Sequence, residues 1–141
     1  MSKSSIPLVL RRQVASDSCY RCGYCLTLEV IGIPMEFDHI IPESHDGPTT
    51  RANLWLACSR CNNSKADRTH AIDSVSQKRV RLFNPRKDKW DAHFRWADGG
   101  QRIEGKTAIG RATVEALNFN LRVRVMARRL WIDAGWHPPL S

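Results

Sequence analysis

The chain has 141 residues, enough for one domain with a small core and an extension. Its residues are 42% hydrophobic and 26% charged, which is typical of a globular protein and excludes an intrinsically disordered chain. No segment approaches the roughly 18 apolar residues of a membrane span, and Pro7 interrupts the short apolar run near the start. We therefore expect no membrane span, no secretory signal and a cytoplasmic location.

Positive charge is concentrated in the second half of the chain. The formal net charge is +8 and the pI is about 9.7. Residues 1–70 carry eight Lys or Arg against seven Asp or Glu, whereas residues 71–141 carry fourteen against seven. Such an excess favours an acidic partner, most simply nucleic acid. We expect the second half to supply most of the long-range attraction.

The first half predicts short strands followed by a helix. Residues 1–18 form a polar lead-in, and residues 19–25 form a cysteine-rich turn around Gly23. Turn formers predict a loop over residues 43–50, and residues 59–68, which lack Gly and Pro, predict a helix. Apolar runs predict strands over residues 28–33, 35–41 and 54–57.

The second half predicts a linker, a hairpin and two helices. Residues 69–92 are polar and basic and predict a linker or wrapping arm with little core of its own. A-D-G-G at 97–100, between H-F-R-W and Q-R-I-E, predicts a hairpin. Thr107 can cap a helix to about Leu117, and a second helix is predicted over 121–134. That helix has an apolar stripe of the kind that packs on a core, formed by Val123, Ala127, Leu130 and Ala134 and flanked by Arg122, Arg124, Arg128 and Arg129.

Two C-x-x-C pairs, Cys22 with Cys25 and Cys58 with Cys61, indicate a metal site. A chain without a secretory signal keeps its thiols reduced, so paired cysteines favour zinc over disulfides. Four thiolates bind Zn²⁺ tetrahedrally at about 2.3 Å and leave no position open for chemistry. We therefore expect a structural Zn²⁺ that stabilises a small domain. The alternative is that the cysteines are buried small apolar residues.

Cys19 offers another choice of ligand, because residues 19–25 read C-x-x-C-x-x-C. Cys19 with Cys22 is the alternative pair. Gly23 gives the turn between Cys22 and Cys25 the flexibility of a metal knuckle, so we expect Cys19 to be a free thiol. A redox function of the pairs is disfavoured, since no thioredoxin-like βαβ pattern surrounds them.

The order of the other motifs resembles the HNH endonuclease family. These motifs are F-D-H-I-I-P, G-P-T-T, N-L and C-S-R-C-N-N-S-K. The resemblance implies an α+β protein with a zinc-stapled ββα-metal core (the HNH or His-Me finger fold) over residues 19–68. Residues 1–18 then form a lead-in. Residues 69–141 form a basic extension, a hairpin and two helices, that packs on the core.

The resemblance also implies a role for each motif residue. Asp38 corresponds to the first ligand of a catalytic divalent ion, and His39 to the general base that deprotonates the attacking water. Asn53 corresponds to the middle Asn, which ties the loop together and helps orient the base. Asn62 corresponds to the second metal ligand, a position often filled by His, and its carbonyl oxygen favours Mg²⁺ or Mn²⁺.

These roles imply a metal-dependent endonuclease that hydrolyses DNA phosphodiester bonds and leaves 5′-phosphate and 3′-hydroxyl ends. A divalent ion neutralises charge that develops on the phosphate, and an imidazole exchanges its proton near neutral pH. Because neighbouring strand residues point to opposite faces, Asp38 and His39 can reach one phosphate only if the strand ends or bends there. The alternative is a catalytically inactive, zinc-stapled nucleic-acid-binding module.

Further basic and aromatic residues have two interpretations each. Trp90, Phe94 and Trp96 either stack on bases or, more commonly, fill a small core. His93 either packs in the hairpin or lies close to the active site. The basic residues are DNA contacts or a solvated surface; they are Lys65, on the predicted helix three residues after Asn62, and Arg79, Arg81, Arg86, Lys87 and Lys89.

Overall fold

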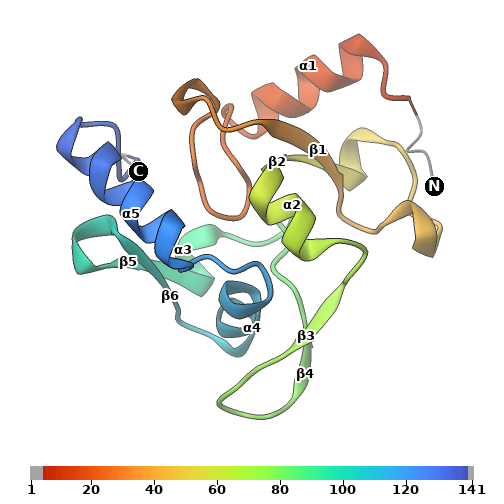
Figure 1. Ribbon diagram of the computed structural model, residues 1–141. Coiled ribbons are helices and arrows are strands. Elements are labelled where there is room, and N and C mark those ends of the chain that lie inside the picture. Colours follow the sequence, from red (N-terminus) through yellow and green to blue (C-terminus); the bar gives the residue numbers. More distant parts are fainter. Residues whose placement is uncertain (1–4, 140–141) are drawn as a thin grey trace. The chain divides into compact units, whose positions relative to one another are not determined.

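The computed structural model describes residues 5–139, in which helices are mixed with small antiparallel sheets (Figure 1). The chain divides into two compact units. The first unit comprises the chain up to Thr69 together with Asn84–Asp88, and the second comprises His70–Phe83 and the chain from Lys89 onward. Within the described residues, no helix is long and apolar enough to cross a membrane.

The first unit is built on a strand–strand–helix motif. β1 (Met35–His39) pairs antiparallel with β2 (Leu54–Cys58), and His39 lies opposite Leu54. α2 (Ser59–Lys65) begins directly after β2, and the Cys58 side chain caps it by accepting a hydrogen bond from the Cys61 amide. The sequence predicts these three elements correctly, and the α+β class with a ββα core is confirmed.

β2 supplies much of the core of the first unit. It reads L-W-L-A-C, and four of its five side chains are buried while Trp55 is half-buried. The strand contacts both α1 (Leu8–Asp17) and α2. Elements on both sides of β2 explain why its sequence is almost continuously apolar.

α1 lies in the segment that the sequence presents as a polar lead-in, where the sequence predicted no helix. Val14 is the one buried residue of this helix, so the apolar stripe by which helices are recognised is missing. The helix is held at Asp17, which accepts hydrogen bonds of 2.7 Å from both Arg51 and Arg86. These guanidinium groups, Arg51 first, hold the pKa of the Asp17 carboxyl well below its usual range.

Residues 28–33 do not form the predicted strand. Glu29–Ile31 make a 3₁₀ turn, and Gly32 ends it in the left-handed region with a φ of 98°. Val30 is 87% exposed, so the apolar run that suggested a strand does not join a core. The next predicted strand is shorter than expected: β1 ends at His39. The loop predicted over 43–50 is present and contains a second 3₁₀ turn, Glu43–His45.

Among the described residues, the second unit contains two hairpins and three α-helices. β3 (His70–Ile72) pairs with β4 (Arg79–Arg81), and β5 (Phe94–Ala97) pairs with β6 (Arg102–Gly105). Its helices are α3 (Trp90–His93), α4 (Ala108–Ala116) and α5 (Arg122–Asp133).

The prediction of this half is correct for the hairpin and both long helices but wrong for the linker. The Thr107 hydroxyl caps α4 by accepting a hydrogen bond from the Gly110 amide. Residues 69–92, expected to have little core, contain the β3–β4 hairpin and the buried side chains of Leu82 and Phe83. Each of these strands has three residues, and β4 alternates arginine with valine, so the hairpin is too short and too polar to stand out in the sequence.

Aromatic side chains fill the core of the second unit. Phe94 is 1% exposed and packs against Phe83 and Phe119 with ring centroids 5.0 and 5.6 Å apart. Trp90 packs against Phe94 and Trp96 at 5.2 and 5.1 Å. His93 donates to or accepts from the Thr107 hydroxyl at 2.6 Å and packs edge-on against Phe83, so it belongs to this core.

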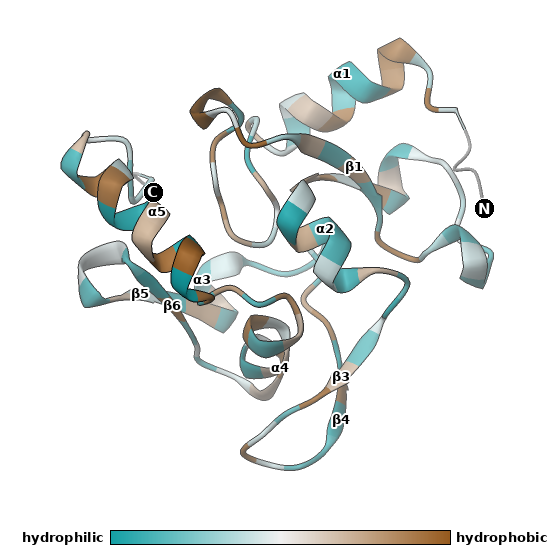
Figure 2. Cartoon of the chain, viewed as in Figure 1, coloured by the Kyte–Doolittle hydropathy of each residue, from teal (hydrophilic) through white to brown (hydrophobic). Residues whose placement is uncertain are grey.

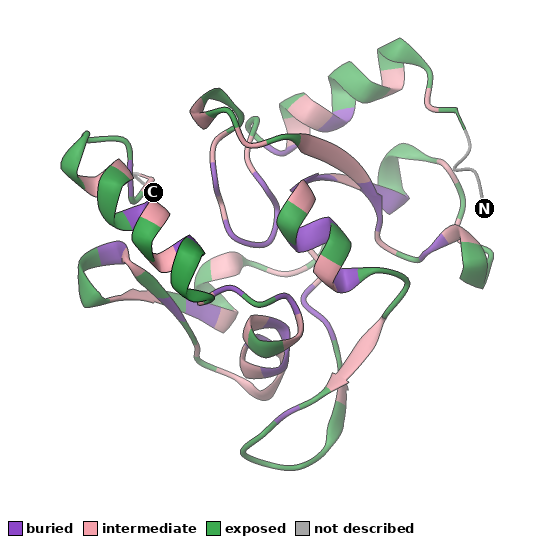
Figure 3. Ribbon diagram, in the orientation of Figure 1, coloured by how far each residue is buried: buried purple, intermediate pink, exposed green. Residues whose placement is uncertain are grey.

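The buried face of α5 is not the one that its apolar stripe predicts. Val123 and Leu130 are 53% and 68% exposed, whereas Arg124 and Arg128 are 5% and 1% exposed. In Figures 2 and 3, hydrophobic segments of α5 coincide with exposed ones. The buried guanidinium groups donate to backbone carbonyls at 2.6 to 3.2 Å, namely those of Gln101, Leu117, Asn118 and Phe119.

Candidate metal centre and active site

The cysteines of the two C-x-x-C pairs form one buried cluster. Their four sulfur atoms lie within 4.8 Å of one another, and the Sγ atoms of Cys25 and Cys58 are 3.7 Å apart. A tetrahedral Zn²⁺ with bonds of about 2.3 Å would separate its sulfur ligands by about 3.8 Å, so the cluster has a suitable size. Cys19 is exposed and outside the cluster, so Cys22 with Cys25, and not Cys19 with Cys22, is the pair that faces Cys58 and Cys61.

The chemistry of the cluster also suits a divalent cation. Backbone amides of Tyr24, Cys25 and Cys61 donate to cysteine sulfurs at 3.4 to 3.5 Å. Burial raises the pKa of the Cys22 and Cys61 thiols, whereas a hydrogen bond with Cys22 lowers the pKa of Cys58. A bound cation compensates the charge of buried thiolates, so a metal such as zinc fits these four ligands.

Gly23 is required for close packing and not for the flexibility that the sequence suggested. A Cβ at this position would lie 2.0 Å from Cδ1 of Trp55 and 2.9 Å from Cβ of Pro85. The Gly23 amide donates to the Leu56 carbonyl at 2.8 Å. The absent side chain lets the 22–25 turn lie against β2, which brings the two cysteine pairs together.

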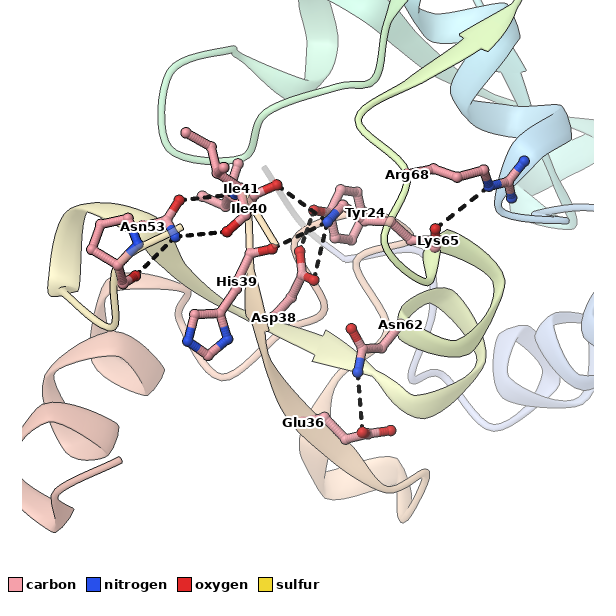
Figure 4. A network of polar contacts seen from close by, with 11 residues as sticks. Tyr24, Glu36, Asp38, His39, Ile40, Ile41, Asn53, Asn62, Lys65 and Arg68 are labelled. Atoms are coloured by element: carbon pink, nitrogen blue, oxygen red, sulfur yellow. Dashed lines mark hydrogen bonds and ion pairs between the residues drawn. The ribbon is translucent and has the colours of Figure 1, made fainter. Parts of the chain in front are cut away.

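Asp38 is buried and its carboxylate has two donors. It is 3% exposed; the Tyr24 hydroxyl donates to Oδ2 at 2.6 Å, and Nζ of Lys65 donates to Oδ1 at 3.2 Å (Figure 4). Burial, followed by the charge of Asp38, raises the pKa of Tyr24, so the phenol remains a neutral donor. The sequence did not indicate Tyr24, because the residue lies inside the cysteine knuckle and not in the D-H motif.

Lys65 is not a solvated surface lysine. Its side chain is 2% exposed, and Nζ also donates to the carbonyls of His39 and Ile40 at 3.2 and 3.3 Å. Lys65 and Asn62 lie three residues apart on α2 and both are buried against the strands. Figure 4 shows the Lys65 ammonium group next to the end of β1. Its contacts lie inside the first unit, at the strand that carries Asp38 and His39.

His39 is the last residue of β1, and its ring is held by the following loop. It is 6% exposed, its Nε2 lies 2.9 Å from Oγ1 of Thr49, and the same nitrogen lies 3.6 Å from Oε1 of Glu43. Figure 4 shows the imidazole turned away from Lys65. Thr49 belongs to the G-P-T-T motif, but its spacing from His39 in the sequence did not predict this contact.

Asn53 holds the loop between the two strands. Its side chain accepts a hydrogen bond from the Ile41 amide at 2.9 Å and donates to the carbonyls of Ile41 and Pro48 at 3.0 and 2.9 Å. Gly47 is needed in the same loop, because a Cβ there would lie 1.7 Å from the Ile41 carbonyl oxygen. These contacts fix the backbone directly after His39 and reach the imidazole only through the loop.

One cavity of about 530 Å³ brings the candidate catalytic residues together. Asp38, His39 and Asn62 all line it, so the end of β1 lets neighbouring residues face one space. Glu36 also lines the cavity and accepts a hydrogen bond from the Asn62 amide at 3.0 Å. None of the sequence motifs includes Glu36, although a residue two positions before Asp38 on a strand shares its face. Carboxylate and amide oxygens are a suitable donor set for Mg²⁺ or Mn²⁺.

Comparison with known proteins finds a family match within the first unit. Residues 22–68 match the family model described as HNH endonuclease. They form an HNH endonuclease domain. The chain is also 39% identical over 67 residues to the CRISPR-associated endonuclease Cas9 of Corynebacterium diphtheriae. That match covers 43% of this chain and 6% of the relative, so the chain spans a small part of that protein. No solved structure gives a significant match.

The basic residues after the HNH domain that were predicted to contact DNA differ in whether their side chains are exposed. Arg86 donates to Asp17 at 2.7 Å and to the Leu54 carbonyl at 3.3 Å, and its guanidinium lies 4.8 Å from the centre of the Trp55 ring. It therefore serves the packing of the first unit. Lys87 and Lys89 are exposed.

Proposed function

We propose that this protein is a DNA endonuclease that hydrolyses phosphodiester bonds with the help of Mg²⁺ or Mn²⁺. The observation that carries the proposal is the convergence of Asp38, His39 and Asn62 on one cavity of an HNH endonuclease domain. A general base beside oxygen ligands for a divalent ion is what metal-assisted hydrolysis of a phosphodiester needs.

His39 is the general base in this proposal. Thr49 orients the imidazole through the contact at Nε2, and Asn53 fixes the loop that carries Thr49. When the imidazole takes the proton of the attacking water, it becomes positively charged. The Glu43 carboxylate, 3.6 Å from Nε2, then stabilises that charge. Thr49, Asn53 and Glu43 are thus positioning and supporting residues, while His39 acts on the water.

Asp38, Asn62 and Glu36 are the proposed ligands of the catalytic ion. The nitrogen of the Asn62 amide is engaged by Glu36, so the carbonyl oxygen is the atom that would face the ion. The bound ion would neutralise charge on the scissile phosphate and on the leaving 3′ oxygen. A carboxylate accepts about four hydrogen bonds, so the two donors on Asp38 leave it capacity for a cation.

Lys65 has a positioning role in this proposal, in place of the DNA contact expected from the sequence. Its ammonium group keeps the Asp38 carboxylate oriented and ties the end of β1 to α2 through the carbonyls of His39 and Ile40. The cysteine cluster acts at longer range: a structural Zn²⁺ there would join the 22–25 turn to the start of α2, which carries Asn62 and Lys65.

One observation favours a second function, a nucleic-acid-binding module without catalysis. Tyr24 and Lys65 already compensate the buried Asp38 carboxylate, so the cavity is stable without a cation. In such a module, Lys65 would replace the ion instead of supporting it. The two functions differ in whether the protein binds Mn²⁺ through Asp38.

The deciding experiment combines cleavage and metal binding. Purified protein is incubated with supercoiled plasmid without added divalent ion, with Mg²⁺ or with Mn²⁺, and Mn²⁺ binding is measured by calorimetry on wild type and Asp38→Asn. We expect cleavage in the presence of the ion and a loss of rate of about 10²- to 10⁴-fold in His39→Ala. His45→Ala, at an exposed histidine of the same loop, is the matched control and should cleave normally. Wild-type rates in His39→Ala would reject the mechanism, and DNA binding without Mn²⁺ binding or cleavage would favour the inactive module.

A further inference from the structure

β3 and β4 form a two-stranded ribbon that the proposed catalysis does not use. His70 lies opposite Arg81, Ala71 opposite Val80, and Ile72 opposite Arg79. Residues that face each other across antiparallel strands project from the same side, and neighbours along a strand project from opposite sides. One face of the ribbon therefore carries His70, Ile72, Arg79 and Arg81, and the other carries Ala71 and Val80.

The second of these faces is anchored within the second unit. α4 contacts both strands, and Ala71 and Val80 are half-buried. Asp73, on the same side and fully buried, accepts hydrogen bonds from Nε and Nη2 of Arg111 at 2.9 and 3.0 Å. It also accepts one from the Ser76 amide at 3.0 Å, which fixes the turn. The ribbon is thus held in place before any partner binds, so little ordering entropy opposes binding.

The outer face is cationic and partly apolar. Lys78, at the end of the turn, and Arg79 are exposed, and Ile72 and Val75 are 52% and 71% exposed. Residues 70–81 contain one acidic residue, Asp73, whose charge is turned inward and paired with Arg111. No acidic side chain of the ribbon therefore reduces the positive charge of its outer face.

We propose that the outer face of the β3–β4 ribbon binds duplex DNA, with the ribbon in a groove and Lys78 and Arg79 on phosphates. The major groove is wide enough for a two-stranded ribbon. Cations at the turn and along β4 match the charge of the backbone, and Ile72, on the same face as Arg79, can contact sugars or thymine methyl groups. The choice of DNA as the occupant rests on the proposed function.

The test measures binding without cleavage. Fluorescence anisotropy with short duplex DNA, without added Mg²⁺ or Mn²⁺ and in the His39→Ala background, gives the affinity as a function of salt. Lys78→Gln with Arg79→Gln should weaken binding and reduce the slope of log affinity against log salt by about 2, since each phosphate contact contributes about 0.9. Arg122→Gln with Arg129→Gln, two exposed arginines of α5, removes the same charge and should leave the slope unchanged. Equal losses in both double variants, or a wild-type slope in the first, would overturn the proposal.

A third variant tests the placement in a groove. Ile72→Ser should lower the affinity several-fold without changing the salt slope, because it removes an apolar contact and no charge. Wild-type affinity in this variant would overturn groove binding. Thermal unfolding of each variant verifies the fold. Because binding is measured in a variant without the general base, an uncleaved plasmid in the wild-type assay would reject the proposed catalysis but not the ribbon.

Discussion

Asp38 and Lys65 show how a single buried ion pair can shape a site. The removal of two charges from water costs several kcal/mol, and hydrogen bonds around the pair are needed to offset it. Here they come from Tyr24 to Asp38 and from Lys65 to two carbonyls at the end of β1. Each charge therefore compensates the other, and the pair holds both the Asp38 carboxylate and the end of β1 in position.

A double-mutant cycle on this pair should show strong coupling. Lys65→Met leaves the Asp38 carboxylate buried without its cation, and we expect the free energy of unfolding to fall by about 3 to 5 kcal/mol. Adding Asp38→Asn removes the stranded charge and should restore much of that loss. Urea unfolding of wild type, both single variants and the double variant measures the coupling.

Arg60 provides a control for this cycle. It is an exposed basic residue of the same helix, and Arg60→Met should change the unfolding free energy by less than about 0.5 kcal/mol. Additive losses in the Lys65 and Asp38 variants would show that the two side chains do not stabilise each other.

At this scale the sequence identifies motif residues but not their partners. The D-H and C-x-x-C-N motifs suffice to select Asp38, His39 and Asn62, which the fold does bring to one cavity. Thr49 and Glu36 could not be assigned roles, because their contacts depend on the path of a loop and on the tilt of a helix. Lys65 was misjudged because a lysine in a short polar helix is usually exposed.

Among the elements, α5 is the one whose orientation the sequence predicts least well. The periodicity of apolar residues correctly locates the helix, but it does not decide which face is buried. The apolar face with Val123 and Ala127 and the basic face with Arg124 and Arg128 have the same four-residue spacing. Arg124 and Arg128 lie on the buried face because their guanidinium groups donate to backbone carbonyls at and after the end of α4. The last carbonyls of a helix have no hydrogen-bond partner within that helix. Hydrogen-bond demand from α4 thus outweighs the apolar stripe.

Replacement of Arg128 should be costly, and replacement of its neighbour should not. Arg128→Ala removes the donor to the half-buried Gln101 carbonyl and to the buried Phe119 carbonyl, and we expect a loss of about 3 kcal/mol in the free energy of unfolding. Arg129→Ala removes an exposed side chain from the same turn and should change it by less than about 0.5 kcal/mol. Denaturant unfolding compares them. Equal losses would mean that the buried face of α5 is assigned incorrectly.

The other missed elements have a common cause. α1 buries one side chain and the β3–β4 ribbon has strands of three residues, so neither offers a period long enough to recognise. Both are held by arginine–carboxylate pairs, Asp17 with Arg51 and Arg86 in the first case and Asp73 with Arg111 in the second. Such pairs join residues 34 to 69 positions apart in sequence, and local patterns do not reveal them.

At the scale of the whole molecule, the metal centre and the aromatic core belong to different units. All five cysteines and Trp55 lie in the first unit, whereas the other four tryptophans lie in the second. Each unit has its own buried residues: thiols and β2 in one, phenylalanines in the other. Loss of the metal should therefore act on the first unit.

Removal of the proposed zinc should expose four thiols while the second unit remains folded. Before chelation, a thiol reagent should react rapidly with the exposed Cys19 alone; after chelation, it should react with all five cysteines. Near-ultraviolet circular dichroism should retain most of its aromatic signal, which we assign to the second unit. Metal content is measured in parallel by elemental analysis.

Two cysteine variants serve as controls for this experiment. Cys19→Ser should retain zinc and show no rapidly reacting thiol, whereas Cys58→Ser should lose zinc and unfold the first unit. Five reactive thiols in folded wild-type protein, or the loss of zinc in Cys19→Ser, would contradict the assignment of the cluster.

The chain returns to the first unit at Asn84–Asp88, and this affects which parts of the gene can be exchanged separately. Arg86 and Pro85 contact Asp17, Trp55 and the neighbourhood of Gly23, yet they follow the HNH match by more than a dozen positions. A recombination event that transferred residues 22–68 alone to another gene would leave these contacts behind. To keep these contacts, segment 84–88 must be transferred with the HNH domain, and the β3–β4 ribbon, encoded between the two, is then inherited as well. The position of its codons between the HNH domain and segment 84–88 thus links the ribbon to that domain.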